Sequence, residues 1–160
     1  MGVGIIYSPV LSDIQFPEGL IDTLEIEPQM LCIRNSEGKL RAPSSVFNEI
    51  QNLPYKKLVH SIGAPVGGTL IPDQEQINLI NYSAELFNSP WVTEHLSFNA
   101  ITEFNTGFFL PPCQTEKGVQ LVIENIRRLQ QQVNRPFAIE TGVNLSLIHI
   151  SEPTRLLASA

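Results

Sequence analysis

Basic residues are scarce in this sequence. Lysine and arginine together account for 10 of the 160 residues, against 16 aspartate and glutamate residues, so the formal net charge at pH 7 is −6. The ten basic residues are scattered along the chain. Binding to nucleic acid depends on clustered positive charge that contacts phosphates. We therefore expect no nucleic-acid partner.

Long hydrophobic runs are also missing. No stretch approaches the roughly 18 apolar residues that a membrane-spanning helix needs. The N-terminal residues MGVGIIYSP contain neither the basic region nor the long apolar segment of a signal peptide. We therefore expect a cytoplasmic protein without a membrane partner. Hydrophobic residues make up 42% of the chain and charged residues 16%, which is enough for one soluble domain with a sizeable core.

Cysteine is rare as well. Cys32 and Cys113 lie far apart in the sequence, and neither belongs to a CxxC pair or to a Cys/His spacing typical of zinc sites. In a cytoplasmic protein such cysteines are usually reduced. We therefore predict two free thiols.

Strand-like and helix-like segments alternate along the chain. Runs with β preference or period-two alternation predict strands at 2–7, 22–28, 57–62, 91–98 and 137–143. Helical spacing predicts helices at 44–53, 73–88 and 115–133, and the aromatic segment 103–114 is predicted to be a long loop. Five such repeats favour right-handed βαβ units and a parallel sheet. The pattern alone leaves a closed barrel and an open sheet as alternatives.

The segment WVTEHLSF at 91–98 places an acid next to an imidazole, Glu94 and His95. Neighbouring residues on a regular strand point to opposite faces, so one of the two would be a ligand and the other its support. A single histidine on an apolar strand is more often part of the core than a ligand. Glu25 and Glu27 share one face of an earlier strand, which points either toward water or toward a polar barrel interior, and we favour water.

Two more polar residues change the interpretation of His95. His60 lies near the end of a strand, just before the glycine-rich segment GAPVGG, which lacks the phosphate-binding pattern. Glu140 lies near the end of the last predicted strand. In a (β/α)8 barrel, reactive residues gather at the C-terminal ends of the strands. His60, His95 and Glu140 together therefore predict a metal site for non-haem iron, manganese or zinc.

Several motifs carry a family resemblance: LEIEPQ at 24–29, HSIGAPVGG at 60–68, TEHLSF at 93–98, FFLPPCQTEKGV at 108–119 and AIETGVN at 138–144. The chain resembles the multinuclear non-haem iron oxygenases of bacteria, the family that includes the methanobactin biosynthesis oxygenase. The resemblance implies a TIM barrel that holds two or three iron ions. It also implies that dioxygen is used to modify a ribosomally made precursor peptide, often at cysteine, which a partner protein presents.

The same resemblance assigns residues to the site. His60, His95 and Glu140 match metal-ligand positions of the family, and Glu94 matches a motif position that would support them from the second coordination shell. A (β/α)8 barrel needs eight βα units, whereas this chain contains about five. We therefore expect residues 1–144 to be the N-terminal part of the barrel of a longer enzyme, and this chain by itself to be inactive.

The last segment has a different origin in this interpretation. LSLIHISEPTR, at 145–155, resembles the translation of a transposase adapter used in sequencing libraries. We therefore expect 145–160 to be a non-native tail, and His149 and Glu152 to lie outside the site. Two other functions remain as alternatives. One is a divalent-metal isomerase or phosphodiesterase on a similar barrel, and the other is a non-catalytic barrel fragment.

Overall fold

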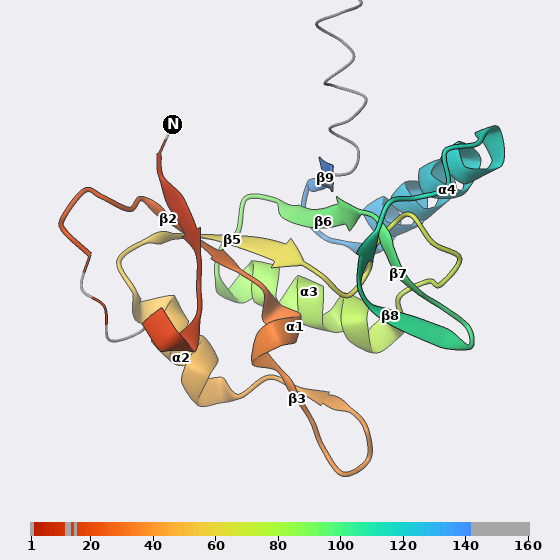
Figure 1. The fold of residues 1–160 in the computed structure, drawn as a ribbon. Coiled ribbons are helices and arrows are strands. Elements are labelled where there is room, and N and C mark those ends of the chain that lie inside the picture. Colours follow the sequence, from red (N-terminus) through yellow and green to blue (C-terminus); the bar gives the residue numbers. More distant parts are fainter. Residues whose placement is uncertain (1, 12–13, 15, 142–160) are drawn as a thin grey trace, which may run out of the picture.

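Five parallel strands form the central sheet (Figure 1). The computed structural model describes residues 2–11, 14 and 16–141. The strands of the sheet, in spatial order, are β1 (Gly4–Ile6), β2 (Thr23–Ile26), β5 (Lys56–Ser61), β6 (Val92–Leu96) and β9 (Phe137–Thr141). Each pairs with its neighbours in parallel. All five lie where the sequence predicts strands, and they confirm the α/β class with a parallel sheet.

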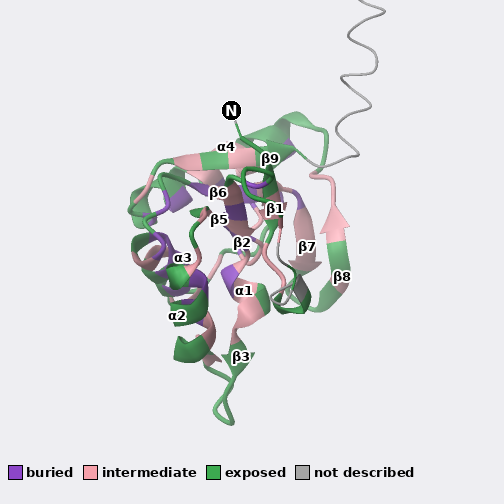
Figure 2. Cartoon of the chain, turned by 90° about the vertical axis from the view of Figure 1, so that its left-hand side faces the viewer, coloured by how far each residue is buried: buried purple, intermediate pink, exposed green. Residues whose placement is uncertain are grey.

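The helices that connect these strands lie on one side of the sheet. They are α2 (Ser44–Asn52), α3 (Gln74–Leu86) and α4 (Glu116–Gln132). Because spatial order follows chain order without a reversal, right-handed crossovers place every connecting helix on the same face. Figure 2 shows these helices wrapped around that face. A sheet wound in one direction is compatible with an arc of a TIM-like barrel.

The two faces of the sheet differ in chemistry. The face toward the helices carries four buried apolar residues of the strands: Leu24, Ile26, Val59 and Val92. They pack against buried apolar side chains of the helices: Phe47, Ile50, Ile77, Ile80 and Leu129. The opposite face carries Glu25, His60, Thr93 and His95. This alternation has the period of two that strands impose. One face therefore forms the core, and the other is available for a polar site.

Side-chain caps begin two of the helices at the predicted places. The Asp73 side chain accepts a hydrogen bond from the backbone N–H of Gln76, at 2.8 Å. The Thr115 side chain accepts one from Gly118, at 3.1 Å. Such caps satisfy backbone donors that have no partner in the first helical turn.

The prediction of a long loop at 103–114 is wrong. Most of it is strand β8 (Phe104–Leu110), which forms an antiparallel hairpin with β7 (Phe98–Ile101). The single strand expected at 91–98 accordingly ends at Leu96, and β7 starts two residues later. Aromatic and β-branched residues on both sides of a two-residue turn favour a hairpin over a loop. Pro111 and Pro112 end the hairpin, because proline has no backbone N–H to continue the strand pairing.

Smaller elements complete the described chain: the 3-10 helix η1 (Pro9–Leu11), helix α1 (Pro28–Leu31) and the short antiparallel strands β3 (Ile33–Arg34) and β4 (Leu40–Arg41). Cys32 and Cys113 are both free, as predicted. Within the described ranges, no helix is long and apolar enough to cross a membrane. The predicted tail at 145–160, with His149 and Glu152, lies outside the described residues.

Candidate metal centre

Strand register brings three of the predicted site residues to one end of the sheet. His60 is the penultimate residue of β5 and pairs with Thr93 of β6. His95 lies two residues further along β6 and pairs with Glu140 of β9. Side chains of paired residues in a parallel sheet point to the same face. The C-terminal ends of three adjacent strands therefore direct His60, His95 and Glu140 toward one point.

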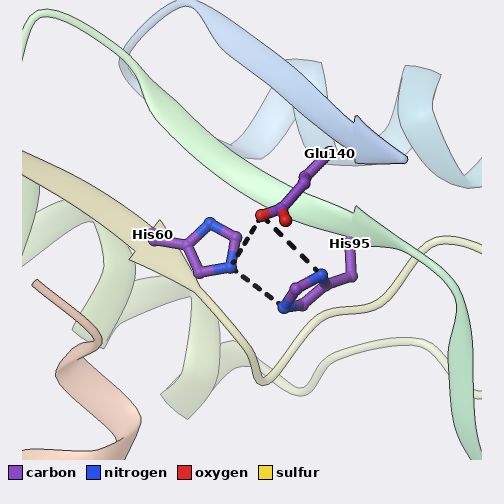
Figure 3. Close-up of side chains that lie close together, drawn as sticks. All are labelled: His60, His95 and Glu140. Carbon is purple, nitrogen blue, oxygen red and sulfur yellow. Dashed lines mark hydrogen bonds and ion pairs between the residues drawn. The ribbon is translucent and has the colours of Figure 1, made fainter. Parts of the chain in front are cut away.

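The polar atoms of these three side chains lie within contact distance (Figure 3). The two histidine Nε2 atoms are 3.0 Å apart. Glu140 Oε2 lies 3.4 Å from His60 Nε2 and 3.9 Å from His95 Nδ1. The two imidazole rings meet edge to face, with centroids 4.5 Å apart. Each residue can offer one ligand atom such that all three atoms lie within 4.8 Å of one another.

Burial across this cluster is graded. The His60 side chain is 3% exposed, that of His95 18% and that of Glu140 53%. Burial lowers the pKa of both histidines, and at His95 the nearby His60 lowers it further, while the Glu140 charge acts in the opposite direction. Lowered pKa values favour neutral imidazoles, which are the form that binds metal. The cluster thus offers two neutral nitrogen donors and one carboxylate that solvent or a ligand can reach.

The donor spacing can be compared with that of a metal site. Bonds of about 2.0–2.1 Å to nitrogen and oxygen, at the angles of tetrahedral or octahedral coordination, place neighbouring ligand atoms about 2.9–3.4 Å apart. The His60–His95 Nε2–Nε2 distance of 3.0 Å and the His60 Nε2–Glu140 Oε2 distance of 3.4 Å fall in this interval, whereas His95 Nδ1 and Glu140 Oε2, at 3.9 Å, lie slightly outside it. Two imidazoles and a carboxylate suit a divalent transition-metal ion such as iron, manganese or zinc. The residues present therefore fit such an ion.

Glu94 lies on the opposite face of β6, toward the helices. Its side chain is fully buried and accepts three hydrogen bonds: Oε2 accepts from Ser61 Oγ at 2.7 Å and from the Ala64 backbone N–H at 2.8 Å, and Oε1 accepts from the His95 backbone N–H at 2.8 Å. Burial raises the pKa of Glu94 to about 7, although these hydrogen bonds oppose the rise. Glu94 thus holds the backbone of His95 and does not touch the imidazole.

The glycine-rich segment 63–68 packs along the end of β6. The backbone N–H groups of Val66 and Gly67 donate to the carbonyl oxygens of His95 and Ser97, at 3.2 and 2.7 Å. A Cβ atom at Gly67 would lie 2.6 Å from the Ser97 oxygen, so this close approach requires glycine. From the helix side, the buried Asn125 amide donates to the carbonyl oxygens of Val66 and Gly68. The segment therefore fixes the backbone at the site.

Sequence reasoning missed two acidic neighbours of His60. Ligand atoms of Glu25, Glu27 and His60 lie within 4.8 Å of one another, so these residues form a second group that could hold a metal ion. Both glutamates are half-buried, so the alternative of a polar interior face describes them better than the favoured solvated face. Burial raises the pKa of Glu25, and the charge of Glu140 raises it further. The period-two spacing of Glu25 and Glu27 was the available signal, but only pairing of β2 with β5 places them beside His60.

Sequence reasoning also left the position of Phe109 open. The Phe109 ring of β8 packs against the imidazole of His95, with centroids 4.2 Å apart and planes tilted by 39°. The sequence placed this residue only within the aromatic segment 103–114. At Phe109 the hairpin covers one side of His95.

Known proteins resemble this chain over most of its length. Residues 2–154 match the model of a family described as "RiPP precursor modification enzyme MbnB/TglH/ChrH", where RiPP denotes a ribosomally synthesised and post-translationally modified peptide. A UPF0276 protein of Streptomyces avermitilis is 27% identical over 147 residues, which cover 88% of this chain and 29% of that protein. The chain thus spans less than a third of the length of this curated relative.

Proposed function

Because the chain belongs to the MbnB/TglH/ChrH family of RiPP precursor modification enzymes, we propose that it is part of an iron-dependent oxygenase. The substrate is a ribosomally made precursor peptide, modified at cysteine with dioxygen as co-substrate and presented by a partner protein. The family description supports the peptide substrate. Iron, dioxygen, the cysteine target and the partner protein follow from the resemblance of the motifs.

The observation that carries this proposal is the convergence of His60, His95 and Glu140. Three donors from three different strands meet with spacings that suit one divalent ion. In this proposal His60 and His95 hold iron through imidazole nitrogens, and Glu140 provides a negatively charged oxygen. Iron bound there would supply open coordination positions for a thiol sulfur and for dioxygen.

The surrounding residues have separate roles in this proposal. Phe109 shields one side of the His95 ring from water. Glu94 and the segment 63–68 hold the backbone of His95 in place from the core side. Glu140, which is more than half exposed, lies on the side from which a peptide can approach. In this proposal His60 and His95 thus fix the ion, and the more exposed side of the centre, at Glu140, receives the substrate.

We propose further that the described sheet is the first part of a (β/α)8 barrel and that 1–144 belongs to a longer enzyme. Two features of the sheet support this arrangement. Its strands follow one another in one direction, and the face opposite the helices, which would be the inside of the barrel, is polar. The relative from Streptomyces avermitilis is more than three times as long as the aligned region, which leaves room for further strands. In the same proposal 145–160 is a non-native tail.

Metal analysis with matched histidine variants tests the site. The chain is purified without oxygen, loaded with Fe²⁺ and dialysed, and its iron content is measured beside H60A, H95A and H149A. Loss of an imidazole ligand should lower the affinity by about tenfold or more for the first two variants, whereas H149A should retain the iron content of the unmodified chain. Unchanged iron binding in the H60A/H95A double variant would contradict the site and favour the non-catalytic alternative.

The reaction is tested on the longer parent protein with its precursor peptide. Oxygen uptake that depends on both iron and the peptide is expected, together with a mass change at a cysteine. One zinc or manganese ion per chain without oxygen uptake would contradict the oxygenase and support a divalent-metal isomerase or phosphodiesterase.

A further inference from the structure

The second nitrogen of His60 has a specific partner. His60 Nδ1 lies 2.6 Å from the hydroxyl oxygen of Thr93, its register partner on β6. The His60 side chain is only 3% exposed, so this nitrogen has little access to water. A buried N–H without an acceptor is costly, because it loses its hydrogen bond to water and gains none in return. Thr93 therefore determines whether a proton on Nδ1 can be accommodated.

A second contact, at the long end of hydrogen-bond distances, favours one direction for the Thr93 hydroxyl hydrogen. Thr93 Oγ1 donates to the backbone carbonyl oxygen of Val59, at 3.5 Å. With its hydrogen directed there, Oγ1 presents a lone pair to His60 and accepts from Nδ1–H. A neutral imidazole has only one proton. Nε2 then keeps its lone pair, and Nε2 is the atom that faces His95 and Glu140.

We propose that Thr93 is a positioning residue that fixes His60 in the Nδ1–H tautomer, so that Nε2 is the metal-binding atom. This inference rests on the proposed metal centre. If the hydroxyl instead donated to Nδ1, the proton would lie on Nε2 and point into the centre, where it would exclude a metal ion. The β-branched side chain of Thr93 restricts χ1 and keeps the oxygen beside the ring.

The arrangement distinguishes the two histidines. His60 has a protein acceptor for its second nitrogen at hydrogen-bond distance. His95 Nδ1 lies 3.9 Å from Glu140 Oε2, which is beyond hydrogen-bond distance. Partners of this kind orient ligating histidines, and their loss typically lowers metal affinity roughly 10–100-fold. Of the two imidazoles, His60 is thus the preorganised ligand.

Threonine variants of the full chain test the inference with Zn²⁺ as the probe. T93V keeps the shape and removes the hydroxyl, T93S keeps the hydroxyl, and T102V makes the same change at an exposed threonine of the hairpin turn. Competition with a chromophoric chelator should show Zn²⁺ affinity lowered roughly 10–100-fold in T93V. T93S and T102V should stay within about threefold of the parent chain. Equal affinity of folded T93V and the parent chain would overturn the inference.

A spectroscopic measurement covers the case in which T93V does not fold. In the zinc-loaded parent chain with ¹⁵N-labelled histidine, the His60 ring should show a slowly exchanging proton on Nδ1 and a zinc-shifted Nε2. A proton on Nε2, or zinc on Nδ1, would overturn the inference whatever the variants do. Failure of the parent chain to bind Zn²⁺ at all would overturn the proposed metal centre as well. Zinc binding that T93V leaves unchanged would overturn only the role of Thr93.

Discussion

Glu94 is an ionisable residue enclosed by the core, and its environment explains why it can be there. An ionised carboxylate in the interior is costly unless hydrogen bonds compensate for the lost water. Three donors meet its two oxygens, from Ser61, Ala64 and His95. These donors come from the end of β5, the glycine-rich segment and β6. One carboxylate therefore joins three parts of the chain next to the candidate metal centre.

We expect E94Q to lower the free energy of unfolding by about 1–3 kcal/mol. Glutamine presents an NH₂ group where a carboxylate oxygen now accepts a hydrogen bond, so at least one buried donor loses its partner. Urea denaturation followed by circular dichroism measures the change. E85Q, at an exposed position of α3, is the matched control and should shift the free energy by less than about 0.5 kcal/mol. Equal midpoints for E94Q and the parent chain would contradict this role.

At the scale of the element, the β7–β8 hairpin acts as a cover for one side of the site. Phe108 and Phe109 are neighbours on β8, so they point to opposite faces. Phe108 is 64% exposed, whereas Phe109 packs on the His95 ring. The hairpin therefore contributes a single aromatic contact to the candidate metal centre and leaves other aromatic surface exposed.

Truncation of Phe109 should loosen a metal ion bound at this centre. An aromatic contact of this kind contributes about 0.5–1.5 kcal/mol, which corresponds to roughly a two- to tenfold change in an equilibrium or rate constant. We expect F109A to release Zn²⁺ to excess EDTA faster by that factor in a stopped-flow experiment. F108A removes the same ring from the exposed face and should release Zn²⁺ at the parent rate. Identical rates for both variants would show that the hairpin does not protect the ion.

The elements differ in how far local pattern predicts them. Strands β5, β6 and β9 and the three long helices follow from periodicity and capping, because both depend on residues a few positions apart. The hairpin was missed because Asn105 and Gly107 of β8 suggest a loop, while cross-strand pairing of Phe98 with Leu110 stabilises strands. His60, His95 and Glu140 could be selected because each lies at a strand end.

At the scale of the whole molecule, the sheet has two open edges. β1 and β9 each pair with only one strand among the described residues. The polar inner face has no second layer of sheet opposite it in the described part of the chain. Exposed edges and uncovered apolar residues, such as Val3 and Ile6 at β1, promote association between chains. In a closed barrel, further strands would pair with both edges.

We therefore expect this chain to self-associate and to bind at most one iron ion, weakly. Sedimentation velocity measures association, and metal analysis measures iron, for the 160-residue chain, for 1–144 alone and for the longer parent. Removal of 145–160 should change neither property. The longer enzyme, with its barrel complete, should be a monomer and should hold two or three iron ions. If 1–144 were monomeric and matched the longer enzyme in iron content and dioxygen uptake, the proposal that the barrel is incomplete would be contradicted.

The sequence by itself determined the α/β class, the order of the five strands of the central sheet and of the three long helices, and the three residues of the candidate metal centre. These properties depend on periodicity and on position within a strand, both of which are local. Only the tertiary structure decided that Glu25 and Glu27 lie beside His60, that Thr93 contacts its second nitrogen and that Phe109 covers His95. Those contacts join segments distant in the chain, and they depend on the register between strands, which no single segment specifies.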